Sequence, residues 1–243
     1  MTLDRGPAAG APIAPPRPGR IVLVCGTGTE VGKTWVASRL LEELRARGFD
    51  VAARKPAQSF DVDAAGVRMG GPTDAEELGR ASGEPPDQVC RIDRSFHRAM
   101  APPMAAEALG LPPFTIGDLV DELVWPDPAV DVGLVELAGG VLSPQASDGD
   151  VTHFIRALRP DLVVLVSDAG LGTINGVRSS LAALRPVVVD EDGPVLTVLN
   201  RFDPRHDIHR RNLQWLAERD GFEVITLPGS IVELADRVDS LRA

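Results

Sequence analysis

The chain has 243 residues, of which 44% are apolar, and its formal net charge is −10. This length and composition suit one α/β domain with a large core. The acidic balance argues against a nucleic-acid partner, because a phosphate backbone would be repelled. No apolar run approaches the ~20 residues of a membrane span, so no membrane partner is expected. Two cysteines, Cys25 and Cys90, suit a reducing compartment, and the cytoplasm is the expected location.

Residues 1–19 are rich in Pro, Ala and Gly. They lack the apolar stretch of a secretory signal, and their composition predicts a disordered tail. The globular domain is therefore expected over residues 20–243.

Within that domain, short β-branched runs alternate with longer amphipathic patterns. Apolar runs predict strands at 21–25, 51–55, 132–137, 162–167, 195–200 and 223–227. Helical spacing predicts helices at 34–47 and near 74–82, 104–110, 115–124, 150–158, 174–185, 207–219 and 230–241. This alternation predicts a single doubly wound α/β domain, with a mainly parallel sheet and helices on both faces.

Right-handed crossovers in such a sheet place the loops that follow the strands along one edge, where ligands bind. The residues that carry chemistry fall in these loops. They occur in 26–34, 55–59, 136–140 and 167–175, and at Asn200 and Pro228.

The segment Gly26–Thr34 (GTGTEVGKT) is assigned to the phosphate-binding loop G-x-x-x-x-G-K-[ST], because it follows an apolar strand and precedes an amphipathic helix. The backbone amides of such a loop point at phosphate oxygens, and the helix N-terminus adds positive charge. Lys33 is expected to reach the β- and γ-phosphates, and the Thr34 hydroxyl to bind Mg²⁺. Partitioning ATPases carry a lysine as the second residue of the loop, and Thr27 argues against that subgroup.

Several further segments occur in one order along the chain. They are KPAQS at 55–59, Thr73-Asp74, APPMAAEALG at 101–110, VELAGG at 135–140 and GLGTIN at 170–175. Together with the loop at 26–34, over roughly residues 21–230, this series resembles the dethiobiotin synthetase family.

The resemblance implies a P-loop enzyme that uses ATP and Mg²⁺. It implies that 7,8-diaminononanoate is carboxylated with CO₂ or bicarbonate through a carbamate and a carbamic–phosphoric anhydride, and that the ring then closes. It also implies a homodimer. Such chemistry depends mainly on positioning and on neutralising charge.

The resemblance assigns the catalytic roles to Lys55 and Lys33, and the Mg²⁺ ligands to Thr34, Asp74 and Glu136. For Lys55, the alternative is an ordinary surface lysine. For Asp74, it is an acid that caps the helix after it. Glu136 lies within an apolar strand, where an unpaired carboxylate would be costly, and a metal would offset that cost.

The remaining binding roles also rest on the resemblance. Nucleotide contacts are implied for Thr29, Glu30, Val31, Gly32, Lys33, Thr34, Trp35, Asp74, Glu136, Leu137, Ala138, Gly139, Asn200, Arg201, Pro228 and Gly229. Substrate contacts are implied for Ser59, Gly140, Thr173, Ile174 and Asn175. The last three open a helix that would receive the substrate carboxylate across the dimer, as a helix N-terminus can. A turn role is the alternative for Asn200, Pro228 and Gly229.

Three positions depart from the family pattern. Leu137 replaces the usual glycine after the strand-end glutamate, and its side chain either crowds the phosphates or faces the core. Phe60 stands where a small residue commonly follows the substrate serine. Gly170 replaces a lysine before the helix at 174–185. All three lie nearer the expected substrate than the nucleotide.

Two other functions fit part of the pattern. An ATP-dependent amidoligase on the same scaffold usually carries a further glutaminase domain, for which this chain has no room. A P-loop regulatory protein that switches a partner would lack a substrate-side site, and KPAQS and APPMAAEALG argue against it.

Overall fold

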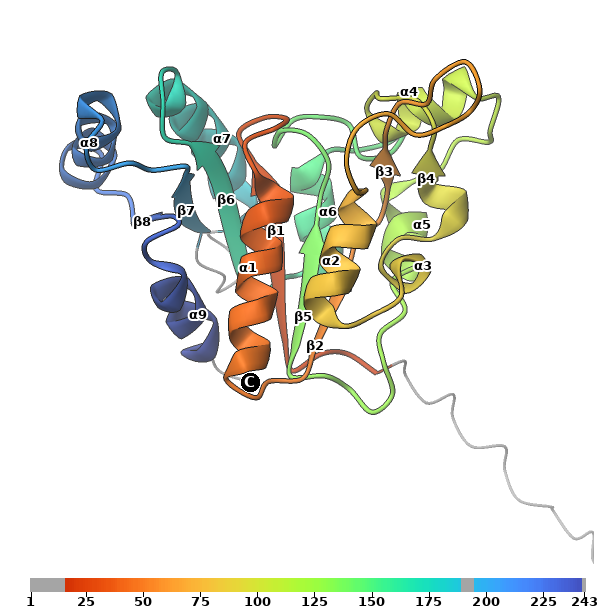
Figure 1. Cartoon of the computed structure of the whole chain (residues 1–243), viewed down its shortest axis with the longest axis horizontal. Coiled ribbons are helices and arrows are strands. Elements are labelled where there is room, and N and C mark those ends of the chain that lie inside the picture. Colours follow the sequence, from red (N-terminus) through yellow and green to blue (C-terminus); the bar gives the residue numbers. More distant parts are fainter. Residues whose placement is uncertain (1–15, 189–194, 242–243) are drawn as a thin grey trace, which may run out of the picture.

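The computed structural model of the chain describes residues 16–188 and 195–241. Within them lies a sheet of strands in the order β2-β5-β1-β6-β7-β8, and every neighbouring pair is parallel. Helices cover both faces of this sheet (Figure 1). The doubly wound α/β fold expected from the sequence is therefore confirmed.

The strands of the main sheet alternate with helices along the chain. The main strands are β1 (Arg20–Gly26), β2 (Val51–Arg54), β5 (Val132–Glu136), β6 (Leu162–Asp168), β7 (Val195–Asn200) and β8 (Val224–Thr226). The helices are α1 (Lys33–Ala46), α2 (Asp74–Ser82), α3 (Pro86–Val89), α4 (Pro102–Ala108), α5 (Ile116–Asp121), α6 (Val151–Leu158), α7 (Thr173–Val188), α8 (Asp207–Gln214) and α9 (Ile231–Asp239).

Alternate residues of each central strand point to opposite faces, and each face has its own core. In β1, Leu23 and Cys25 face the core that α5, α6 and α7 complete, whereas Val22 and Val24 face the core that α1, α2 and α9 complete. All four side chains are essentially fully buried. A strand buried on both faces has to be apolar throughout, which explains the continuous run in the sequence.

The structure also contains elements that the sequence did not predict. A separate two-stranded parallel sheet pairs β3 (Gln58–Ser59) with β4 (Ser95–Phe96). The short helix α3 and a 3₁₀ turn (Ile92–Arg94) precede β4. The helix expected at 207–219 is α-helical only in α8 and continues as a π-helical segment, Trp215–Arg219.

The expected tail coincides only in part with the described structure. Residues 1–15 lie outside the described residues. The rest of the segment packs against the domain, since Arg17 donates hydrogen bonds to the carbonyls of Leu158 and Arg159, and Gly19 donates to Val130. Over the described ranges, no helix combines the length and apolar character needed to cross a membrane.

The strand order places β1 where the winding of the sheet reverses. After β1, the chain first forms β2 and β5 on one side of it and then β6 on its other side. Ligands bind at such a reversal in doubly wound sheets, beyond the carboxyl ends of the strands. The loop after β1 lies at that edge, which is the upper edge in Figure 1.

Candidate active site

The loop after β1 wraps around the start of α1. Gly32 lies in the left-handed region with φ of 90°, and α1 begins at the next residue. A Cβ atom on Gly32 would lie 2.1 Å from Nδ2 of Asn200, so only glycine fits here. Asn200 uses this close approach to donate a hydrogen bond to the Val31 carbonyl at 3.0 Å. The end of β7 therefore holds the loop in shape.

The same loop is one residue longer than the expected motif. Five residues separate Gly26 from Gly32, whereas G-x-x-x-x-G-K-[ST] has four. The strand-loop-helix context and the Gly-Lys-Thr ending are retained. Lys33 folds back over the loop, and its Nζ donates to the Gly28 carbonyl at 2.9 Å. Burial, helped by the nearby charge of Lys55, lowers the pKa of Lys33 below its usual value.

Four side chains from four elements meet beside this loop. The Lys55 Nζ lies 2.6 Å from Oε1 of Glu136 and 2.7 Å from Oδ2 of Asp74. The Thr34 hydroxyl donates toward Oδ1 of Asp74 and Oε1 of Glu136, both at 2.9 Å. The three residues expected to bind Mg²⁺ and Lys55, one of the two expected catalytic lysines, thus form one contiguous cluster.

The register of the sheet explains how Lys55 and Glu136 meet. Arg54, the last residue of β2, pairs with Val135 of β5, so Lys55 directly after β2 and Glu136 at the end of β5 lie at the same level. Lys55 is 2% exposed and Glu136 is fully buried, which rules out a surface role for the lysine. Asp74 is the first residue of α2, but Thr73 caps that helix, with Glu76 completing the capping box. The Asp74 carboxylate is therefore available to the site.

The charged side chains of this cluster change one another's pKa values. Burial alone would lower the pKa of Lys55, but Asp74 and Glu136 outweigh that effect, and its pKa is raised. The charge of Lys55 lowers the pKa of Asp74. Burial raises the pKa of Glu136, and Lys55 only partly opposes it. Lys55 is thus held as an ammonium between the two acids.

The donor set suits Mg²⁺. The second oxygen of Glu136, Oε2, is buried and has no hydrogen-bond partner among the described residues. A carboxylate oxygen buried in this way is costly unless a cation or water binds it. Hydroxyl and carboxylate oxygens are ligands that Mg²⁺ prefers, with waters and phosphates completing its shell. Thr34, Asp74 and Glu136 would hold the ion here.

Two cavities with a common border open at this edge. One has a volume of about 490 Å³, and the expected site residues that line it are Thr29, Glu30, Gly32, Lys33, Thr34, Lys55, Ser59, Asp74, Glu136, Ala138, Gly139 and Arg201. The second, of about 450 Å³, shares Thr29, Glu30, Ser59, Ala138 and Gly139 with the first and extends to Ala99, Met100, Ala101, Pro102 and Ser143. The first is large enough for a polyphosphate, and the second adds apolar lining next to it.

Sequence reasoning missed Gln58 and Ser143. Gln58 lines the first cavity, where its amide donates to Ser95 Oγ at 2.8 Å and accepts from the Ala75 amide at 3.0 Å. Gln58 lies within KPAQS, but its partners come from distant segments and leave no local signal.

Other expected site residues lie outside the two cavities. Val31 belongs to the phosphate loop, and Asn200 holds that loop through its hydrogen bond to the Val31 carbonyl. Arg201 does line the first cavity; it has φ of 57°, and its guanidinium donates hydrogen bonds to Asp168 and the Glu30 carbonyl. The set Trp35, Gly140, Thr173, Ile174, Asn175, Pro228 and Gly229 lines neither cavity. Their binding roles stay predictions.

Thr173 nevertheless connects to the phosphate loop. Its hydroxyl lies 2.7 Å from Ser167 Oγ, which in turn accepts from the Thr27 hydroxyl at 3.2 Å. Ser167 and Thr173 are both buried. The start of α7 is therefore tied to the loop through three hydroxyl groups.

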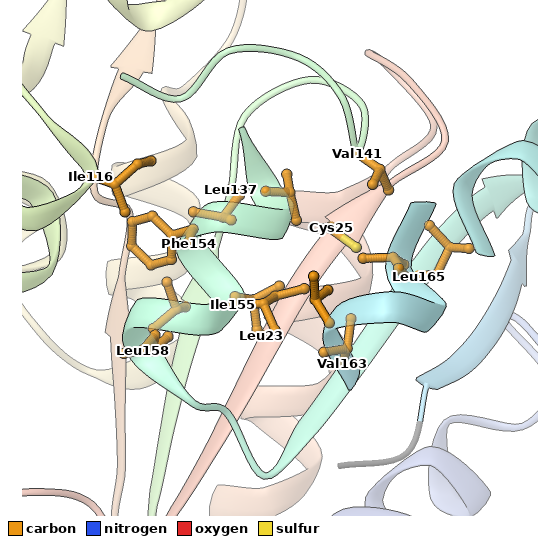
Figure 2. Close-up of a cluster of buried hydrophobic side chains, with 14 of the residues drawn as sticks. Leu23, Cys25, Ile116, Leu137, Val141, Phe154, Ile155, Leu158, Val163 and Leu165 are labelled. Atoms are coloured by element: carbon orange, nitrogen blue, oxygen red, sulfur yellow. The ribbon is translucent and has the colours of Figure 1, made fainter. Parts of the chain in front are cut away.

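The three departures from the family pattern have separate structural outcomes. Leu137 is 1% exposed and packs in the core near Ile116 and Phe154 (Figure 2), so its side chain does not crowd the phosphate cavity. Phe60 lies against the His97 ring with centroids 5.1 Å apart. Gly170 donates to Asp168, and its carbonyl accepts from Asn212.

Comparison with known proteins extends these observations. A family model described as an AAA domain matches residues 20–226. The ATP-dependent dethiobiotin synthetase BioD of Rhodococcus jostii is 39% identical over 165 residues, which are 68% of this chain and 67% of that protein. The protein of the same name from Anaeromyxobacter dehalogenans is 38% identical over 193 residues, 77% of this chain and 79% of the relative.

Solved structures show the shared fold. A plasmid partition protein from Borrelia burgdorferi superposes with a TM-score of 0.51 at 11% identity, over 91% of this chain and 96% of that chain. This likeness concerns the fold alone.

Proposed function

Because the chain belongs to the family of ATP-dependent dethiobiotin synthetases, we propose that it carboxylates 7,8-diaminononanoate and closes the product to a cyclic urea, at the expense of ATP. The observation that carries the proposal is the position of Lys55. Its ammonium is buried between Asp74 and Glu136, at the border of the cavity that Lys33 and the phosphate loop also line.

The proposed reaction has three steps. One amine of the substrate attacks CO₂, loses a proton and becomes a carbamate. A carbamate oxygen attacks the γ-phosphorus, and the bond from that phosphorus to ADP breaks. The second amine attacks the carbamoyl carbon, the bond to phosphate breaks, and the nitrogen loses a proton as the ring closes.

The residues of the chain supply charge and position for these steps. Lys33 and Lys55 would neutralise the negative charge that gathers on the γ-phosphate and the carbamate. Ser59 lies at the border of the two cavities, so its hydroxyl would meet the diamine where the apolar lining begins. Met100 and Pro102 would contact its aliphatic chain.

A magnesium ion held by Thr34, Asp74 and Glu136 would supply further positive charge to the phosphates. The free Oε2 of Glu136 supports this assignment. The homodimer, the cytoplasmic location and the carboxylate-binding role of Thr173, Ile174 and Asn175 belong to the same proposal and rest on the family resemblance.

The proposal is tested by measuring phosphate release from ATP with the diamine and bicarbonate, each present or omitted. We expect release only when both are present, with one phosphate for each cyclic urea detected by mass spectrometry. Lys33→Ala should abolish release, because Lys33 is the lysine of the phosphate loop. Phosphate release that ignores the diamine would refute the assignment.

A further inference from the structure

The loop that follows β5 lies against both cavities. Ala138 and Gly139 line each of them. Gly140 packs on the phosphate loop so closely that a Cβ atom there would lie 3.3 Å from the Thr27 carbonyl oxygen. The shape of residues 138–140 therefore affects both the phosphate side and the apolar side of the site.

One side chain from further along the chain fixes this loop. Gln145 is 3% exposed, and its amide accepts from the Ala138 N–H at 3.1 Å and donates to the Ala138 carbonyl at 2.8 Å. It also donates to the Ser143 carbonyl at 3.1 Å. The carboxamide thus pairs with both backbone groups of Ala138, as a neighbouring strand would.

Gln145 is itself held from the opposite side. Its backbone N–H donates to the Gly149 carbonyl at 2.9 Å. The turn at 146–149 is fastened to α5, since the Ile116 amide donates to Asp148 at 2.8 Å and the Ser147 amide to Phe114 at 3.0 Å. The core around α5 therefore supports the loop through Gln145.

The pairing also decides which backbone donors remain for a ligand. Gln145 occupies the Ala138 amide, and the Ser143 hydroxyl accepts from the Gly140 amide at 3.0 Å. Between them, the Gly139 amide donates to no other described residue, and Gly139 lies in the left-handed region with φ of 66°. The loop is thus left with the Gly139 amide as its unoccupied donor beside the cavities.

We propose that Gln145 is a positioning residue for the reaction, which acts through residues 138–140 and touches no ligand. This inference rests on the proposed function. Burying a carboxamide costs more than burying a hydrocarbon of the same size, so core packing alone gives no reason for glutamine. The fixed geometry of the loop does, because small misplacements at a reacting centre are expensive.

Two variants test the proposal. Gln145→Met keeps the volume and loses all three hydrogen bonds, and we expect kcat to fall about tenfold to a hundredfold. Binding of a non-hydrolysable ATP analogue should weaken far less than kcat falls, because Lys33 and the phosphate loop also line the phosphate cavity. Gln145→Glu has one donor and one acceptor only when protonated. Its kcat per folded protein, relative to wild type, should therefore rise as the pH is lowered, whereas a purely structural role would change only the folded fraction.

A destabilised control separates positioning from stability. Val238→Ala opens space in the core on α9, away from the loop, and should lower the melting temperature with kcat unchanged. A wild-type kcat in Gln145→Met, or a Gln145→Glu ratio independent of pH, would overturn the inference.

Hydrogen exchange makes the inference independent of turnover. The Ala138 amide should exchange faster in Gln145→Met than in the wild type, whatever reaction the protein catalyses. Unchanged exchange would overturn the positioning role. A wild type that releases no phosphate with the diamine would instead refute the proposed function.

Discussion

Two neighbouring basic residues at the end of β2, Arg54 and Lys55, each face a glutamate that is largely or fully buried, but the two pairs differ in how completely they are bonded. Arg54 lies 2.7 Å from Glu84 and above the Trp125 ring. Both oxygens of Glu84 accept hydrogen bonds, from Arg54 and from the Ala53 amide. Glu136 has only one bonded oxygen, and its other oxygen has no partner among the described residues. The completed pair stabilises the fold, whereas the incomplete pair retains capacity for a ligand.

Breaking the completed pair should have the largest effect, and the effect should be on stability. Arg54→Met leaves the largely buried Glu84 carboxylate without its counter-charge, and we expect the free energy of unfolding to fall by about 3–5 kcal/mol. Urea denaturation measures this. Because Arg54 lines neither cavity, kcat at low temperature should stay near wild type. A large loss of kcat in a folded variant would contradict the division of roles.

Breaking the incomplete pair should instead remove catalysis. Lys55→Met deletes a charge that would stabilise the transferring phosphoryl group, and we expect kcat to fall about 10²–10³-fold. The diamine-dependent release of phosphate measures this. Lys55→Arg is the control, because it keeps the positive charge but replaces the compact ammonium with a guanidinium. It should recover little of the activity lost in Lys55→Met. Equal losses of stability in Lys55→Met and Arg54→Met would remove the contrast between the pairs.

Metal dependence sharpens the assignment of the site carboxylates as Mg²⁺ ligands. Asp74→Asn should raise the Mg²⁺ concentration for half-maximal activity about 10–100-fold. Binding of Mn²⁺ followed by electron paramagnetic resonance should weaken in parallel. Glu77→Gln, an acid-to-amide change in the first turn of the same helix, is the matched control. A shift of equal size in this control would indicate a general effect of charge.

The smallest expected effect is the pH dependence of stability in the ligand-free protein. Burial raises the pKa of Glu136, so the folded protein binds its proton more tightly than the unfolded chain does. The contribution of Glu136 to stability should therefore be greatest below the usual glutamate pKa and fall as the pH rises through the raised one. The slope is at most about 1.4 kcal/mol per pH unit. Glu136→Gln should lack this component in thermal melts at several pH values, and parallel curves for the two proteins would refute it.

Much of the fold follows from the sequence because the pattern is local. The continuous apolar run at 21–25 and the alternation of strands with helices are sufficient to predict a buried parallel sheet. The short pair β3–β4 gives no such signal, because each strand has two residues and its partner is distant in sequence. The helix at 102–108 begins at Pro102, a residue favoured in a first turn, where the sequence reading placed the start two residues later.

The candidate site was predictable where a residue is of a type unexpected for its segment of the sequence. Glu136 interrupts an apolar strand, and Lys33 follows a glycine-rich loop. The supporting hydrogen bonds were not predictable, because Gln58 and Gln145 bind backbone groups that only the folded chain brings near. The alternatives for Leu137 needed the structure as well, because a leucine in a loop fits either environment.

The burial of both site lysines has a practical consequence. Lys33 and Lys55 are the only lysines in the chain, whose other permanent cations are 23 arginines. Every side-chain amine of the protein therefore lies at the phosphate edge of the sheet. An isotope-labelled methyl group added to side-chain amines would place spectroscopic probes at these two positions alone. Two signals, one titrating below and one above the ordinary lysine range, would report the two environments directly, and a nucleotide that shields them would slow the labelling.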